Sequence, residues 1–228
     1  MQTKETFTAA LLSLAAMALS AAQADVSGDR AQAIANAAPK MTVLARPVLP
    51  VAAAVTRDSG LVTIFSNLAA KYPNGEYWCC SGYNIMGPQQ GEQWIAAAFT
   101  PNANHTVTKI DVAAGWSEGP NGLVVSLNAD NKGVPGKTLK TWMVSGLPLF
   151  GTCCGLIELS SRKGIPIAGG RQYWVMLSTN DSETDTVDGW NVSDADQVDQ
   201  ATIASYSDNQ WHVFQAAPDV AFAVKGSD

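Results

Sequence analysis

Residues 99–144 have the sequence FTPNANHTVTKIDVAAGWSEGPNGLVVSLNADNKGVPGKTLKTWMV. In it, stretches in which apolar and polar residues alternate are separated by segments rich in Gly, Pro, Asn and Asp. Two runs place an apolar residue at every second position: Ile110, Val112 and Ala114 in the first, and Leu123, Val125 and Leu127 in the second. Successive side chains of a strand point to opposite faces of its sheet, so this alternation predicts consecutive antiparallel strands with one buried face.

The same signal continues on both sides of this stretch. Residues 93–100 are mostly apolar, Tyr173, Val175 and Leu177 alternate with their neighbours, and residues 220–224 form a last apolar run. Turn residues occur at 121–122, 130–136 and 169–170, and no long run shows the helical period of about 3.6 residues. We therefore expect an all-β domain over residues 59–228, a two-sheet antiparallel, jelly-roll-like sandwich of about eight strands.

The first 24 residues have the features of an export signal. Lys4 precedes an apolar run over residues 7–22, and Ala22-Gln23-Ala24 is the small-x-small pattern that signal peptidase recognises. The run is too short for a membrane-spanning helix, which needs about 20 apolar residues. The sequence therefore predicts cleavage after Ala24, a secreted or periplasmic protein, and no membrane span once the signal has been removed.

Composition separates a linker from the domain. Residues 25–58 are rich in Ala, Val and Pro, and the prolines prevent a long helix, so we expect a linker or pro-segment there. The whole chain has 20 acidic and 14 basic residues, a net charge of −6, and the acidic excess lies after residue 58. Such a domain is unsuited to binding nucleic acid or an anionic membrane surface.

Four segments of the domain carry a family resemblance: SNLAAKYPNGEYWCCSGYNI, AAAFTPNANHTVTKIDVAAGW, SLNADNKGVPGKTLKTW and IPIAGGRQYWVMLST. Together they resemble the exported bacterial domains called choice-of-anchor R, over roughly residues 63–224, with ADNKGVPG followed later by QYWV as the most specific part. The resemblance implies an extracellular β-sandwich and supplies no catalytic residues. Similar domains precede different C-terminal anchors, whereas here only Lys225-Gly226-Ser227-Asp228 follows Val224, which favours a released or periplasmic protein.

Catalytic motifs are scarce. The chain has 2 histidines; His105 is expected in a turn-like segment and His212 in a strand beside Trp211, both without a catalytic role. A glycoside hydrolase needs two carboxylates that flank a sugar, and the glutamates of the domain are scattered: Glu76, Glu92, Glu118 and Glu158. The prediction is a non-catalytic binding or structural module of the cell surface or extracellular space, and the alternative is a glycan-active hydrolase.

An acidic tract suggests calcium as a ligand. Residues 172–224 contain no lysine or arginine, and seven acids gather between residues 181 and 199: Asp181, Glu183, Asp185, Asp188, Asp194, Asp196 and Asp199. Carboxylates in flexible loops are the oxygen ligands that calcium prefers. Acidic loops also keep exported proteins in solution without binding an ion, so both interpretations stay open. No other cofactor is indicated.

The 7 tryptophans are many for one domain, and some of them are candidates to stack on sugar rings. Trp174 has the opposite strand parity to Tyr173 and Val175, so only one of the two sets can face the core. Trp190, between Gly189 and Asn191 at the edge of the acidic tract, is the second candidate for exposure. The sequence therefore predicts Trp174 and Trp190 as ligand-stacking residues, with an extracellular glycan or the surface matrix as the partner.

The 4 cysteines form two pairs of neighbours, Cys79-Cys80 and Cys153-Cys154. In an exported chain an even number favours disulfides over free thiols or a zinc site. A bond between neighbours closes a strained ring, so we expect bridges across the two pairs, in either of the two crossed patterns. Such a bridge closes a long loop, and the loop-entropy estimate is about 4 kcal/mol of stabilisation.

Overall fold

The computed structural model describes residues 38–44, 60–68, 77–152, 155–180, 182, 184–193 and 201–228. In these residues the chain forms strands and one short 3-10 helix, η1 (Pro88–Gln90), all within the unit formed by residues 39–228. The predicted all-β class is confirmed. The strand count is higher than the expected eight, because some strands, such as β3 (Trp78–Met86), lack a clean alternation of buried and exposed residues and do not show the predicted pattern.

Six antiparallel strands form the largest sheet. In spatial order they are β13 (Gln210–Ala217), β12 (Ala201–Ser207), β4 (Trp94–Phe99), β10 (Tyr173–Ser178), β7 (Gly122–Asp130) and β8 (Pro135–Ser145). The strands predicted at residues 93–100 and from Tyr173 onward lie beside each other at its centre, with Val175 opposite Ala97. Strands β8 and β13 are its edges.

Two four-stranded antiparallel sheets complete the fold. One has the order β2 (Val62–Ser66), β14 (Phe222–Ser227), β5 (His105–Val112) and β9 (Ile157–Ile167). The other has the order β1 (Met41–Val43), β3, β11 (Val187–Val192) and β6 (Ala114–Glu118).

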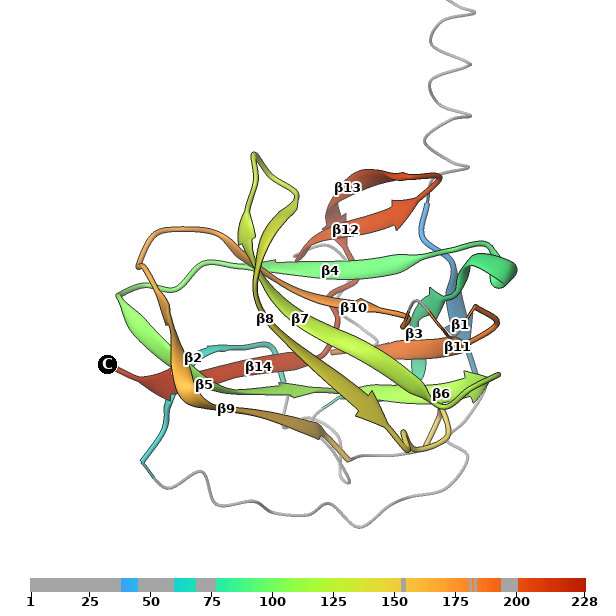
Figure 1. Ribbon diagram of the computed structural model, residues 1–228, viewed down its shortest axis with the longest axis horizontal. Helices are drawn as coiled ribbons and strands as arrows, with labels where there is room; N and C mark the ends of the chain where they lie inside the picture. The colour runs from blue at the N-terminus through green and yellow to red at the C-terminus, as the bar shows by residue number, and fades with distance from the viewer. Residues whose placement is uncertain are drawn as a thin grey trace, which may run out of the picture. The chain divides into compact units, whose positions relative to one another are not determined.

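The two four-stranded sheets are continuous at Ala113, the single residue between β5 and β6. The Ala113 N–H donates to the carbonyl of Ala221, and the Asn191 N–H donates to the carbonyl of Ala113, at 3.1 and 2.8 Å. Figure 1 shows β14, β5, β6 and β11 in one layer and β4, β10 and β7 in the layer that faces it. The arrangement is that of a β-sandwich.

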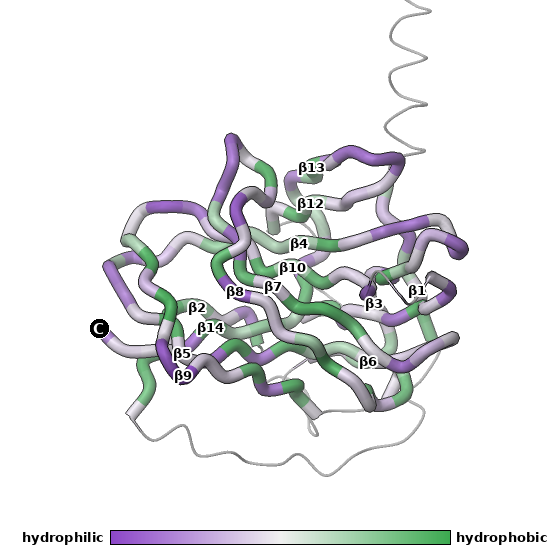
Figure 2. Tube along the Cα trace, viewed as in Figure 1, coloured by the Kyte–Doolittle hydropathy of each residue, from purple (hydrophilic) through white to green (hydrophobic). Residues whose placement is uncertain are grey.

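The core lies between these layers. Val175 and Leu177 of β10 are fully buried in it, together with Val125 and Leu127 of β7 and Ile110 of β5. These residues belong to the alternating sets that the sequence analysis identified. In Figure 2 hydrophobic residues follow the strands and hydrophilic residues gather in the connections, as burial of apolar surface requires.

Two predicted turns lie where the sequence places them. Lys132 and Gly133 have positive φ values of 57° and 89° in the β7–β8 turn, and the Gly133 N–H donates to Asp130 Oδ2 at 3.1 Å. Gly169 and Gly170 lie between β9 and β10. A Cβ on Gly169 would be 2.7 Å from Ala103 Cα, so glycine allows this turn to pack closely against the chain that leads into β5.

Two expectations need correction. Residues 41–43 were placed in the linker, but they form β1, with Thr42 opposite Gly82 of β3; the two pairing strands are far apart in sequence, so no local pattern reveals the contact. His105 was placed in a turn-like segment, but it is the first residue of β5 and is buried. His212 lies in β13 beside Trp211, as expected.

Candidate functional site

Trp190 does not form a stacking platform. Its side chain is 0% exposed, its Nε1–H donates to the carbonyl of Ala221 at 3.1 Å, and its ring meets that of Phe222 edge-on, with the centroids 5.8 Å apart. The physical reason is that β11 is an interior strand between β3 and β6, and Trp190 faces the core. The prediction for Trp190 is wrong.

Trp174 is also 0% exposed, so the prediction that it stacks on a ligand is wrong as well. The predicted difference in parity is confirmed, because Tyr173, Val175 and Leu177 belong to the core whereas Trp174 lies in a separate cluster with Ala96 and Ala204. The indole Nε1–H donates to Asp130 Oδ1 at 2.8 Å. The outer face of the six-stranded sheet therefore has a small apolar cluster of its own, which buries this side chain.

The two cysteines of the first pair differ in state. Cys79 is disulfide-bonded, whereas Cys80 is a buried free thiol. Their Sγ atoms are 3.9 Å apart, well beyond a disulfide length of about 2 Å, so the neighbours are not bonded to each other. Cys80 packs in an apolar cluster, and burial raises the pKa of its thiol. Because the Cys80 thiol is free, the expected bridge at Cys80 is wrong. Cys153 and Cys154 lie outside the described residues, so the crossed pairing stays a prediction.

The acidic tract is divided by the fold. Asp188 is buried within β11, and not in a loop, because the strand faces that residue inward. Asp185 is exposed in the turn that precedes β11. The remaining five acids lie outside the described residues: Asp181, Glu183, Asp194, Asp196 and Asp199. In the part of the chain that the structure describes, no three His, Cys, Asp or Glu side chains are grouped to hold a metal ion, and calcium stays a prediction.

The carboxylates that the structure brings together are paired with lysines. Lys109 Nζ lies 3.5 Å from Asp111 Oδ1 and 3.1 Å from Glu158 Oε1, and Lys225 Nζ lies 2.8 Å from Asp111 Oδ2. Asp111 is buried, so the lysines offset the cost of removing its charge from water. This arrangement is typical of a stabilising ion-pair network.

A group of aromatic side chains that the sequence analysis did not select lies on the outer face of the six-stranded sheet. Tyr206 of β12 is directly opposite Trp94 of β4 and directly opposite Trp211 of β13. The rings of Trp94 and Tyr206 stack with centroids 4.4 Å apart and planes 15° apart. We call Trp94, Tyr206 and Trp211 the aromatic row.

The orientation of Trp211 sets it apart within the aromatic row. Its ring is tilted by 60° from that of Tyr206, with the centroids 5.3 Å apart, and it packs against the small cluster that contains Trp174. Trp211 is only half-buried, and Val213, which has the same strand parity, is 41% exposed. All three side chains of the aromatic row are half-buried, but Trp94 and Tyr206 cover one face of each other, whereas Trp211 is tilted and not stacked on Tyr206.

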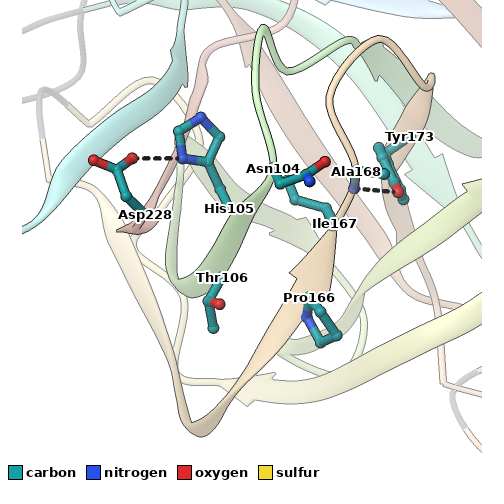
Figure 3. A pocket seen from close by; sticks show the side chains of 8 residues that line it. All are labelled: Asn104, His105, Thr106, Pro166, Ile167, Ala168, Tyr173 and Asp228. Carbon is teal, nitrogen blue, oxygen red and sulfur yellow. Dashed lines mark hydrogen bonds and ion pairs between the residues drawn. The ribbon is translucent and has the colours of Figure 1, made fainter.

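A hollow of about 430 Å³ lies away from the aromatic row, where β5 begins and β9 ends. We call it the His105 pocket; its lining residues are Asn104, His105, Thr106, Pro166, Ile167, Ala168, Tyr173 and Asp228. Figure 3 shows His105 and Asp228 at one end, Tyr173 with Ala168 at the other, and Asn104 between them.

The polar groups of the His105 pocket have defined partners. His105 Nδ1 lies 3.0 Å from Asp228 Oδ1, in a geometry that does not meet that of a hydrogen bond. On the other side of the ring, His105 Nε2 lies 3.4 Å from Asn102 Oδ1. The hydroxyl oxygen of Tyr173 accepts a hydrogen bond from the Ala168 N–H at 2.8 Å. The pocket therefore combines an apolar wall with a few fixed polar groups.

Comparison with known proteins assigns the chain to no family. No protein-family model, curated protein or solved structure matches the chain. Among the described residues no helix is long and apolar enough to cross a membrane. The signal peptide predicted at residues 1–24 lies outside the described residues.

Proposed function

We propose that this protein is an exported, non-catalytic binding module that holds a glycan on the aromatic row. The observation that carries the proposal is the half-buried Trp211, tilted beside the stacked pair of Trp94 and Tyr206. The export pattern of residues 1–24 and the resemblance to choice-of-anchor R domains support a location outside the cytoplasm, secreted or periplasmic.

The chemistry of the aromatic row suits a sugar. An aromatic face is a flat apolar surface with polar groups at its rim, which matches the apolar C–H face and the peripheral hydroxyls of a pyranose ring. Cross-strand pairing already fixes Tyr206 against both tryptophans, so little side-chain entropy is lost when a ligand binds. The net charge of −6 disfavours polyanionic ligands and favours a neutral glycan.

A glycan array tests the proposal. The mature protein should bind a subset of neutral glycans, and the screen should be repeated with calcium and with a chelator because of the acidic tract. Absence of binding to every neutral glycan would contradict the proposed function. Incubating the bound glycans with the protein and measuring new reducing ends separates the binding module from the alternative, a glycan-active hydrolase, because only the hydrolase produces them.

A further inference from the structure

We propose that the His105 pocket is a second binding site, separate from the aromatic row, which takes a neutral polyhydroxylated group such as a single sugar unit. The aromatic row lies on β4, β12 and β13 of the six-stranded sheet. The His105 pocket is formed mainly at the ends of β5, β9 and β14 and in the adjoining loops. The proposal does not depend on the glycan that the aromatic row binds.

The walls of the pocket are fixed before any ligand arrives. The Gly170 N–H donates to the carbonyl of Pro101 at 2.8 Å, and the Gly169 N–H donates to Asn104 Oδ1 at 3.0 Å. These bonds join the loop before β5 to the loop before β10. A site whose walls are already ordered loses little entropy on binding, so even a small ligand can be held.

Two polar side chains at the pocket are almost fully buried. His105 is 8% and Tyr173 is 7% exposed. The Tyr173 oxygen already accepts the Ala168 N–H, so its own hydroxyl proton is left to donate. Asn104 uses its Oδ1 for Gly169, which leaves its amide N–H groups as donors. Asp228 is exposed beside His105 and supplies carboxylate acceptors.

This set of groups fits hydroxyls better than charges. The remaining lining of Pro166, Ile167 and Ala168 is apolar, and binding pockets typically combine such walls with a few precisely placed polar groups in a volume of about 300–1,000 Å³. No lysine or arginine lines the hollow, and Asp228 repels anions. The Asp228 side chain is largely exposed, so water and salt screen its attraction for a ligand cation. Donors from Tyr173 and Asn104 and acceptors from Asp228, beside an apolar wall, match the hydroxyls of a neutral sugar ring.

His105 allows a direct test, because it lies at only one of the two sites. His105 lines the pocket, whereas His212 pairs with Ser205 and faces the side of the sheet opposite the aromatic row, so its signals serve as a reference. We would titrate the mature protein with the methyl glycosides of glucose, galactose and N-acetylglucosamine and follow the imidazole proton signals by NMR. At least one glycoside should shift the His105 signals saturably, and Trp211→Ala should leave that titration unchanged.

Two variants examine the polar groups. Asn104→Asp keeps the oxygen that Gly169 needs and removes the amide donors, and Tyr173→Phe keeps the ring and removes the hydroxyl. Each should weaken the His105-detected binding about tenfold, as expected for one lost hydrogen bond in a buried site. Unchanged His212 signals and an unchanged melting temperature show that a variant is folded; if Tyr173→Phe fails this control, Asn104→Asp alone decides.

Three results would overturn the proposal. The first is the absence of any saturable His105 shift with the three glycosides. The second is a stronger response to glucuronate or to ethanolamine, which would make the pocket a site for an anion or a cation. The third is wild-type affinity in Asn104→Asp. Glycan binding that is lost in Trp211→Ala and gives no His105 shift would support the aromatic row and contradict the second site, so the two proposals fail in distinguishable ways.

Discussion

Replacing Trp174 by alanine should destabilise the domain by about 3–5 kcal/mol, the usual cost of deleting a buried tryptophan. The side chain is 0% exposed and lies in the outer cluster with Ala96 and Ala204, so the substitution leaves a cavity that small neighbours cannot fill. It also removes the hydrogen bond to the Asp130 carboxylate, 2.8 Å long. Because Asp130 is exposed, water replaces part of that bond, and the cavity makes the larger contribution.

Urea unfolding measures this cost. The free energy of unfolding follows from the midpoint and the slope of the transition, and a domain with a total of about 5–15 kcal/mol retains a measurable transition in most cases. Trp174→Phe keeps most of the ring and should cost clearly less than Trp174→Ala. Trp211→Ala, which removes a half-buried ring, should also cost less. A loss below about 1 kcal/mol for Trp174→Ala would show an exposed side chain and refute the buried arrangement.

Four further predictions concern other parts of the domain. Burial alone would raise the pKa of Asp130, but the hydrogen bonds that its carboxylate accepts from Trp174 and other nearby groups lower that pKa below 3.8. The stability that Asp130 contributes is therefore present above that pH and is lost as the pH falls through the folded-state pKa. The difference in unfolding free energy between wild type and Asp130→Asn should accordingly shrink in acid. Gly189→Ala should cost about 1–3 kcal/mol in urea unfolding, because its Cβ would lie 2.3 Å from the Phe150 ring. Iodoacetamide should label Cys80 only after unfolding, since that thiol is buried and its pKa is raised; rapid labelling of the native protein would contradict this. If the region 181–199 binds calcium, a hundredfold excess of the ion over Kd should stabilise the domain by about 2.7 kcal/mol and raise its melting temperature relative to a chelator; equal melting temperatures would contradict calcium binding.

Strand alternation could be predicted from the sequence because it is a local property. The parity of Tyr173, Val175 and Leu177 against Trp174 is correct in the structure. What parity cannot show is whether the other face of a sheet is covered. Trp174 is buried by its own cluster, and Trp190 lies in an interior strand, so the two tryptophans selected for exposure are both inside.

The aromatic row escaped the sequence analysis because it depends on register between distant strands. Trp94 and Tyr206 are more than 100 positions apart in the sequence and meet only because β4 pairs with β12. Tyr206 and Trp211 are close in sequence and flank a two-residue turn at Asp208 and Asn209, both with positive φ. That hairpin signal was available, and it would have placed these two aromatic residues opposite each other.

The His105 pocket was missed for a related reason. A histidine after Asn and Ala was expected in a turn, but it starts a strand whose neighbour β9 supplies the apolar wall of the pocket. Tyr173 reaches the same place from β10, and Asp228 directly follows β14; neither is close to His105 in sequence. Contacts between residues far apart in the chain follow from sheet order, which alternation alone does not specify.

Isothermal titration of the tightest glycan from the array into three proteins tests the central claim most directly. Wild type and Trp142→Ala should bind with equal affinity, because Trp142 is a half-buried tryptophan of edge strand β8 whose Nε1–H donates to Ser160, outside the aromatic row. Trp211→Ala should bind at least about tenfold more weakly, a loss of about 1.4 kcal/mol. Equal affinity of Trp211→Ala and wild type would contradict the account.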